Sequence, residues 1–297
     1  MIKTLNTELV ETKNGRFFII PRDTIIGKSL KYYGEYAEHE MMLLSHWIQS
    51  EDTVIDVGAN IGTHAVFFSH QVGPMGDVLA FEAQPQLFQL LKKNLSENGC
   101  QNVQAFNAIV GEGASEVTTM IPDYNRDGNF GAFSFRIDNL EQYLPMEDTR
   151  RDLTLPGINL DEQDVRNCHL LKVDSEGMET EVLAGAIDMI GKYRPFLYLE
   201  NNNRASSPAL IEQILSLDYF AHWHLISYYR PDNYLMFPEN IFSAPLELNL
   251  FCVPRELDVD VPGLPLVAGP THWMPDDIAD HKFKVDDLIL VAEAFGR

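Results

Sequence analysis

Short apolar runs rich in β-branched residues alternate with amphipathic helical stretches between residues 53 and 227. The first run, TVIDV at 53–57, is nearly continuous in apolar character, which is typical of a strand buried on both faces of a parallel sheet. The stretch 85–97 begins with a proline and then places four leucines on one helical stripe. This alternation predicts βαβ units, and therefore an α/β fold with helices on both faces of a mostly parallel sheet.

The same pattern places the individual strands of the predicted core. We expect strands at 53–58, 77–82, 103–110, 169–174 and 195–200, with helices between them. Two later runs, 221–228 and 246–253, have strand character and are joined by an irregular loop. They predict that the sheet ends in an antiparallel C-terminal edge, a common feature of doubly wound sheets.

Three segments depart from this rhythm and divide the chain. We predict an N-terminal cap segment at 1–50, with a hairpin followed by a helix, and a core domain at 51–255. The core carries a long insertion at 111–168, and an acidic, proline-containing extension follows at 256–297. Because ordered loops longer than about 12–15 residues are usually functional, we expect the insertion to contain substrate-selecting elements.

The most informative run is DVGANIGTH at 56–64, where the first strand meets its helix. Gly58 and Gly62 allow a sharp turn that presents backbone N–H groups and a helix N-terminus to a ligand. Glu82 closes the second strand, where its carboxylate can accept both hydroxyls of a ribose. Asp56 is unfavourable beside a pyrophosphate but favourable beside a cationic group, so the turn favours S-adenosylmethionine (SAM) over a nicotinamide dinucleotide.

Several motifs in order resemble those of FkbM-type class I SAM-dependent methyltransferases over roughly residues 30–205. The matching motifs are YGEY at 33–36, VIDVGANIG at 54–62, FEAQP at 81–85, NA at 107–108, LD at 160–161 and LKVDSEGME at 171–179. This resemblance implies a Rossmann-like fold with a seven-strand sheet. It also implies methyl transfer, most often to an oxygen of a small molecule or sugar.

The resemblance also implies which residues bind the cofactor. The turn that would hold the amino acid moiety of SAM comprises Asp56, Gly58, Ala59, Asn60 and Gly62, the ribose side comprises Glu82 and Ala83, and Asn107 and Ala108 would lie along adenine. The chain departs from the family at Ser175, where an apolar residue is frequent, and at Met178, where histidine is frequent. These departures leave the implied cofactor site intact, but no acceptor role is transferred to them.

Acceptor chemistry needs a group that removes the hydroxyl proton while donor and acceptor are held in line. Asp174 ends a core strand at the carboxyl edge of the sheet, so it is our first candidate base, with a helix-capping role as the alternative. Glu200, at the end of the next strand, is the second candidate. Tyr36 either contacts the cofactor or packs, whereas Tyr32 is expected to pack.

Other residues with chemical potential receive simpler interpretations. The segment Asn129–Phe133 either bends over the cofactor or forms an ordinary hairpin turn, and we favour the turn. His222 and His224 share one strand face, but no third ligand lies nearby in the sequence, so no metal is predicted. His64 is expected on the surface of its helix.

Composition limits the partners that we expect. The chain has 22 Lys and Arg against 44 Asp and Glu, a net charge of −22, which disfavours nucleic acid and anionic membranes. No signal peptide and no apolar run of about 20 residues is evident, and the three cysteines are far apart. We therefore expect a cytoplasmic protein with core thiols that acts on a small hydroxylated metabolite or sugar.

Two rival functions remain open at this point. An NAD(P)-dependent oxidoreductase would use the same type of sheet, and a methyltransferase-like protein without catalysis would serve as a binding or scaffold subunit. The sequence leaves the acceptor, the choice between oxygen and nitrogen, and homo-oligomerisation undecided. We expect the acceptor pocket between the N-terminal segment, the insertion and the loops that follow Asp174 and Glu200.

Overall fold

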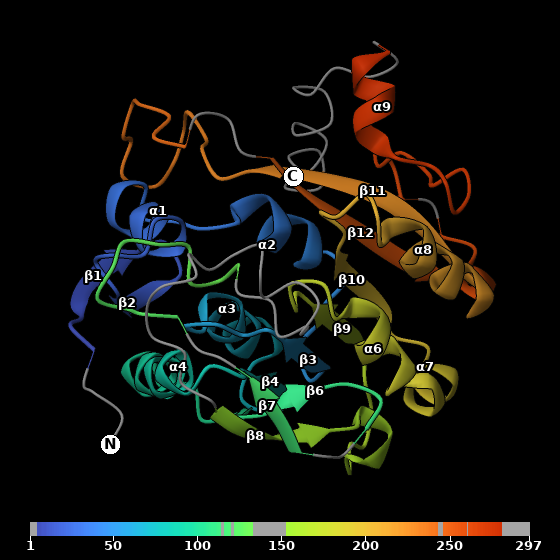
Figure 1. Ribbon diagram of the computed structural model, residues 1–297, viewed down its shortest axis with the longest axis horizontal. Coiled ribbons are helices and arrows are strands. Elements are labelled where there is room, and N and C mark those ends of the chain that lie inside the picture. The colour runs from blue at the N-terminus through green and yellow to red at the C-terminus, as the bar shows by residue number, and fades with distance from the viewer. Residues whose placement is uncertain are drawn as a thin grey trace.

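The computed structural model describes residues 5–113, 116–119, 122–132, 153–242, 246–259 and 261–280. Its main sheet has seven strands in the order β11-β12-β10-β9-β3-β4-β5 (Figure 1). In chain order these are β3 (Thr53–Val57), β4 (Asp77–Phe81), β5 (Val103–Phe106), β9 (Leu170–Val173), β10 (Phe196–Glu200), β11 (Tyr219–Ser227) and β12 (Leu246–Pro254). The strands from β10 to β5 pair in parallel, whereas β12 pairs antiparallel with both β10 and β11. The predicted Rossmann-like architecture and its antiparallel edge are confirmed.

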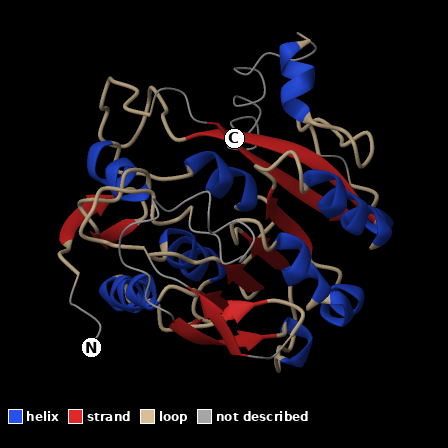
Figure 2. Ribbon diagram, in the orientation of Figure 1, coloured by secondary structure: helices blue, strands red, loops and turns tan. Residues whose placement is uncertain are grey.

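Helices cover both faces of this sheet (Figure 2). The helices of the core are α2 (Glu38–Leu44), α3 (Thr63–Val72), α4 (Pro85–Glu97), α6 (Glu179–Ala184), α7 (Ile187–Tyr193) and α8 (Ser207–Ser216). Apolar residues of α2, α3 and α4 pack on one face, and those of α6, α7 and α8 pack on the other. Successive residues of a strand point to opposite faces of the sheet. Val54 therefore packs with residues of α2 and α3, and Ile55 packs with residues of α6, α7 and α8.

The strand expected at 103–110 is shorter in the structure. β5 ends at Phe106, and β6 (Ile109–Val110) belongs to a separate three-stranded sheet with β7 (Glu116–Thr119) and β8 (Leu153–Ile158). The side chain of Asn107 explains the break, because its Nδ2 donates to the carbonyls of Glu82 and Ala83, each at 2.9 Å. The two intervening residues therefore turn back toward the end of β4.

The N-terminal segment forms the expected hairpin and helix and is fastened to the core. The hairpin joins β1 (Glu8–Thr12) to β2 (Gly15–Ile19), and α1 (Ile26–Tyr32) precedes α2. Asn94 of α4 accepts from the Phe18 amide at 2.7 Å and donates to the Phe18 carbonyl at 3.1 Å. The hairpin thereby extends the layer that α3 and α4 begin.

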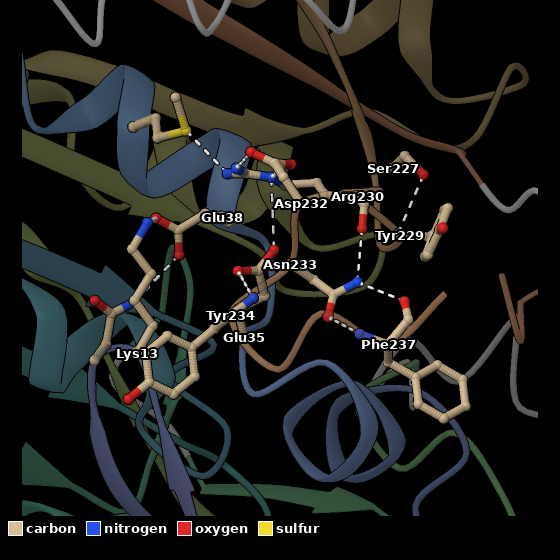
Figure 3. A network of polar contacts seen from close by, with 12 residues as sticks. Lys13, Glu35, Glu38, Ser227, Tyr229, Arg230, Asp232, Asn233, Tyr234 and Phe237 are labelled. Atoms are coloured by element: carbon tan, nitrogen blue, oxygen red, sulfur yellow. Dashed lines mark hydrogen bonds and ion pairs between the residues drawn. The ribbon is translucent and has the colours of Figure 1, made fainter. Parts of the chain in front are cut away.

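A loop at 228–242, orange at the upper left of Figure 1, lies against α1 and the residues that follow it. The Leu235 amide donates to the Tyr33 carbonyl at 3.0 Å, and the Tyr33 hydroxyl bridges the loop backbone. Figure 3 shows Arg230 of the loop between two acids, with ion pairs of 3.6 Å to Glu35 and 2.8 Å to Asp232. We call this junction between residues 33–38 and 228–242 the clasp.

The remaining segments surround this core. The C-terminal extension pairs with β11, because the Trp223 and Val267 amides donate to the carbonyls of Pro265 and Ala221, each at 2.8 Å. The short helix η2 (Leu160–Glu162) follows β8, and η3 (Arg255–Leu257) follows β12. The last described element is α9 (Met274–Ala279). The three cysteines are buried free thiols. No helix in the described ranges has both the length and the apolar character to cross a membrane. Part of the predicted substrate-selecting insertion at 111–168, chiefly residues 133–152, lies outside the described residues.

Candidate functional site

A cavity with about 190 Å³ of free space opens at the carboxyl ends of the central strands. One lining residue follows or ends each of four strands: Gly58 after β3, Glu82 after β4, Asp174 after β9 and Glu200 at the end of β10. Ligands of open α/β sheets bind at this edge. The structure thus brings the two candidate bases and the predicted ribose acid to one cavity.

The glycine turn shapes the floor of this cavity. Gly58 has a φ of +84°, and a Cβ atom there would lie 1.7 Å from the carbonyl oxygen of Asp174. Only glycine therefore allows the ends of β3 and β9 to approach so closely. Gly62, with a φ of +94°, does not line the cavity and instead allows contact with Leu91 of α4.

The N–H groups of the turn do not face a ligand as expected. Every amide from residue 58 to 62 donates within the protein: Gly58 and Ala59 to the Phe81 carbonyl, Asn60 to Glu82, Ile61 to the Asn60 side chain and Gly62 to the Ala59 carbonyl. The expectation that these amides would be offered to the ligand is therefore wrong. The turn contributes close backbone approach and positions Glu82.

Glu82 is held in the cavity wall by two backbone amides. Its Oε2 accepts from the Asn60 amide at 2.8 Å, and its Oε1 accepts from the Gln84 amide at 2.6 Å. Burial raises its pKa to about 7. A carboxylate offers roughly four acceptor positions, so two remain beyond those backbone bonds. Glu82 can thus receive two hydroxyls of a ligand in a fixed orientation.

The residues predicted along adenine divide into two groups. Ala83 and Ala108 line the cavity next to Glu82. Asn107 is absent from the described cavity wall, and its amide instead bonds to the carbonyls of Glu82 and Ala83. Its contribution to the site is therefore to hold the loop after β4 in place.

The segment 129–132 lies over one side of the cavity. Asn129, Gly131 and Ala132 line it, and Gln84 Nε2 donates to the Phe130 carbonyl at 2.8 Å. Tyr124 in turn donates to Gln84 Oε1 at 2.5 Å. Of the two interpretations, the structure supports the segment that bends over the cavity rather than the ordinary turn. Phe133 lies outside the described residues.

Asp56 is wholly buried beneath the cavity and is not one of the residues that line it. It lies opposite Lys172 on the neighbouring strand, and Lys172 Nζ is 3.6 Å from Asp56 and 3.3 Å from Asp174. Burial acts to lower the pKa of Lys172, but the carboxylates of Asp174 and Asp56 raise it overall. Asp56 therefore influences the cavity indirectly: it pairs with Lys172, and Lys172 in turn orients Asp174.

The expectation for His64 is wrong, because this side chain is buried and lines the cavity. Its Nε2 lies 2.9 Å from Glu40 Oε2 of α2. Burial lowers the pKa of His64 to about 3 and raises the pKa of Glu40 to about 8. The packing of α2 across the first turn of α3 buries the pair, and spacing within α3 alone does not reveal this packing.

Aromatic residues from both sides of the clasp close the cavity. Tyr36 and Tyr228 line it, and their rings stack at 5.6 Å with 20° between the planes. The Tyr228 hydroxyl donates at 2.5 Å to Glu247 of β12, which is also a lining residue. Tyr36 was a candidate, whereas Tyr228 and Glu247 were missed. The sequence did contain a signal for Glu247. An antiparallel strand at 246–253 was predicted, and its direction brings the start of β12 to the carboxyl edge of the sheet.

Asp174, Glu176 and Glu200 form a group whose carboxyl oxygens lie within 4.8 Å of one another. Burial raises the pKa of Glu176 and of Glu200 well above the ordinary range. Asn202 Nδ2 donates to Glu200 at 2.6 Å. Such a group can accept a proton or hold a cation.

The capping role considered for Asp174 belongs to a neighbour. Glu179 Oε1 accepts from the Ser175 amide at 3.2 Å and from the Gly177 amide at 3.0 Å, just before α6.

His222 and His224 are both buried, and the Tyr198 hydroxyl lies 2.8 Å from His224 Nδ1. Neither histidine belongs to a group of three metal-binding side chains within the described ranges.

A mixed seven-strand sheet with this order, and an acid-lined cavity at its carboxyl edge, define a Rossmann-like fold of the methyltransferase type. The model of the FkbM methyltransferase domain matches residues 56–224, which is more than half of the chain. The chain therefore belongs to the FkbM methyltransferase domain family.

Individual relatives are more distant. "Methyltransferase 1" of Beauveria bassiana is 29% identical over 146 residues, covering 46% of this chain and 58% of the relative. "Methyltransferase sdnD" of Sordaria araneosa is 24% identical over 212 residues, covering 62% and 78%. The chain thus spans only a little over half the length of the first relative.

The solved structures that resemble this chain are also distant in sequence. A methyltransferase FkbM from Methylobacillus flagellatus KT is 19% identical, with a TM-score of 0.42 over 68% of this chain and 43% of that one. The O-methyltransferase TomG from Streptomyces achromogenes, solved in complex with SAM, is 11% identical, with a TM-score of 0.41 over 73% and 78%.

Proposed function

We propose that this chain is a SAM-dependent methyltransferase that methylates a hydroxyl oxygen of a small polar acceptor. One observation carries the choice of cofactor: five carboxyl groups and no lysine or arginine line the described part of the cavity. A sulfonium nucleoside carries positive charge at the sulfur and the amino group, so such a lining attracts it.

The same lining speaks against a nicotinamide dinucleotide. A pyrophosphate needs backbone N–H donors or basic side chains, yet the amides of the glycine turn are engaged within the protein. Its negative charge would also meet the five carboxyl groups. These features favour the methyltransferase over the oxidoreductase.

The residues present fit the groups of SAM. Glu82 would accept the ribose hydroxyls through its two remaining acceptor positions, with Ala83 and Ala108 along the base. Gly58 lets the ends of β3 and β9 approach closely, which places the backbone of the turn beside Asp174 in the cavity wall, where the amino acid moiety would bind. When bound, SAM supplies a methyl group on a positively charged sulfur.

The remaining chemistry falls to the carboxyl groups. Asp174 is held by Lys172 at 3.3 Å, which fixes its orientation toward the cavity. Glu200 has a raised pKa because of its burial, so it binds a proton more readily than an exposed acid. We propose that one of these two carboxyls removes the proton of the acceptor hydroxyl while the cavity aligns the reacting atoms.

The first test is binding. SAM or S-adenosylhomocysteine should raise the melting temperature of the purified protein, and NAD(H) and NADP(H) should leave it unchanged. A shift with the dinucleotides alone would reject the methyltransferase assignment. SAM binding without formation of S-adenosylhomocysteine against any hydroxylated acceptor panel would instead favour the scaffold function.

A further inference from the structure

A second cavity, with about 240 Å³ of free space, adjoins the first. The two share Glu176, Glu200 and Asn202 in their walls, at the carboxyl ends of β9 and β10. The second cavity lies on the far side of these residues, where α6 and α8 begin. A molecule in it would contact the same side chains as a cofactor in the first cavity.

The lining of the second cavity is polar almost throughout. It contains the amides of Asn201, Asn202 and Asn203 and the hydroxyls of Thr180 and Ser206, whereas Leu210 is its one aliphatic residue in the described wall. Most of these groups bond to other protein atoms: the Thr180 hydroxyl donates to Glu181, Asn201 Nδ2 to Ser207, Asn202 Nδ2 to Glu200 and the Ser206 hydroxyl to Asn203. None of these bonds engages Oδ1 of Asn201, a residue only 4% exposed, so this oxygen retains acceptor positions that an apolar molecule would leave unused. The cavity therefore suits a molecule with hydroxyl or amine groups.

The charged residues of the shared wall indicate which class of polar ligand the second cavity would bind. Glu176 and Glu200 are the acids of this wall, and their carboxyl oxygens lie within 4.8 Å of one another and of Asp174, which lines the first cavity only. An ammonium group has three N–H donors, so it can bond to both carboxyl groups of the wall at once. Arg204 is the basic residue of the described wall, and both of its terminal nitrogens bond to Asp276 at 2.7 Å.

We propose that the second cavity is the acceptor subsite and that its acceptor is an amine-bearing polyol, bound through its ammonium group at Glu176 and Glu200. This proposal rests on the methyltransferase function proposed above. A hydroxyl of the acceptor then enters the first cavity through the shared wall. Its oxygen forms a bond to the methyl carbon as the sulfur–methyl bond breaks; the electron pair returns to sulfur, and the hydroxyl proton passes to a carboxylate.

The test compares three probes that share a ring and differ in charge: D-glucosamine, D-glucose and D-glucuronate. Each is titrated by protein-observed NMR into protein saturated with S-adenosylhomocysteine. We expect glucosamine to bind at least about fivefold more tightly than glucose, with glucuronate weakest, as expected for a charge-assisted hydrogen bond. Equal affinities, a reversed order or no binding of any probe would overturn the proposal.

Two variants locate the effect. Glu176→Gln should reduce the preference for glucosamine over glucose to less than about twofold, whereas Glu212→Gln, an exposed acid on α8, should retain it. An equal loss in both variants would show a general charge effect and reject the site. MgCl2 forms a separate arm: displacement of glucosamine by Mg²⁺ would assign the carboxyl group to a metal instead. Prior titration with S-adenosylhomocysteine separates the outcomes, because failure of that step rejects the proposed function itself.

Discussion

Replacing Glu82 by alanine should weaken binding of S-adenosylhomocysteine about 100-fold. The structure leaves two acceptor positions on Glu82 for ribose hydroxyls, since the Asn60 and Gln84 amides occupy the others. Two hydrogen bonds to a charged acceptor, at about 1.5 kcal/mol each, give about 3 kcal/mol, or roughly a factor of 100 in the dissociation constant. The two amides also lose their acceptor, so a lower melting temperature accompanies the change.

Isothermal titration calorimetry at pH 8 measures this loss with Glu82 ionised, because burial raises its pKa to about 7. Circular dichroism at the assay temperature confirms that the variant is folded. Glu212→Ala, which removes an exposed acid on α8, serves as the matched control and should bind like the parent protein. A folded Glu82→Ala protein with an affinity within about twofold of the parent would refute the ribose role.

Four further predictions follow from the same geometry. Affinity for S-adenosylhomocysteine should rise about tenfold from pH 6 to 8, since Glu82 must lose its proton to accept both hydroxyls; a flat calorimetric profile would contradict its role. With an acceptor in hand, Asp174→Asn should lower kcat about 100-fold with a much smaller change in cofactor affinity, and unchanged turnover would remove Asp174 as the base. Lys172→Met should destabilise the fold by about 3–5 kcal/mol in urea unfolding, because Asp56 is left as a buried unpaired charge; an unchanged midpoint would show that this pair is not needed. Gly58→Ala should cost more than about 2 kcal/mol by the same measurement, since its Cβ would collide with the Asp174 carbonyl; near-normal stability would show that the strands can separate there.

The fold was largely predictable because the parallel core strands are short, mostly apolar runs followed by turn residues. The apolar run of β3 and the leucine stripe of α4 suffice to identify a buried strand and a helix packed against the sheet. The extent of β5 was not predictable in this way. The apolar pattern continues beyond Phe106, and the break depends on side-chain bonds of Asn107 to residues 25 and 24 positions earlier.

The cavity lining could be predicted where a residue directly follows a core strand, as Gly58, Glu82 and Asp174 do. It was missed where residues meet only through packing. His64 was interpreted as a surface residue because its partner, Glu40, belongs to a helix in another part of the chain. Glu247 was missed because strand pairing, rather than spacing, brings it to Tyr228.

The clasp has a consequence for how this domain can be subdivided. The family model matches residues 56–224, a stretch that includes neither side of the clasp. It therefore also lacks Tyr36, Tyr228 and Glu247, which line the cavity. A truncated protein with those bounds would keep Glu82 but would lose the first three residues of β3 and the residues of the clasp that close the cavity. Any excised or grafted version of the domain therefore has to carry the flanking sequence on both sides, because the stretch that the family model matches is shorter than the stretch that encloses the cavity.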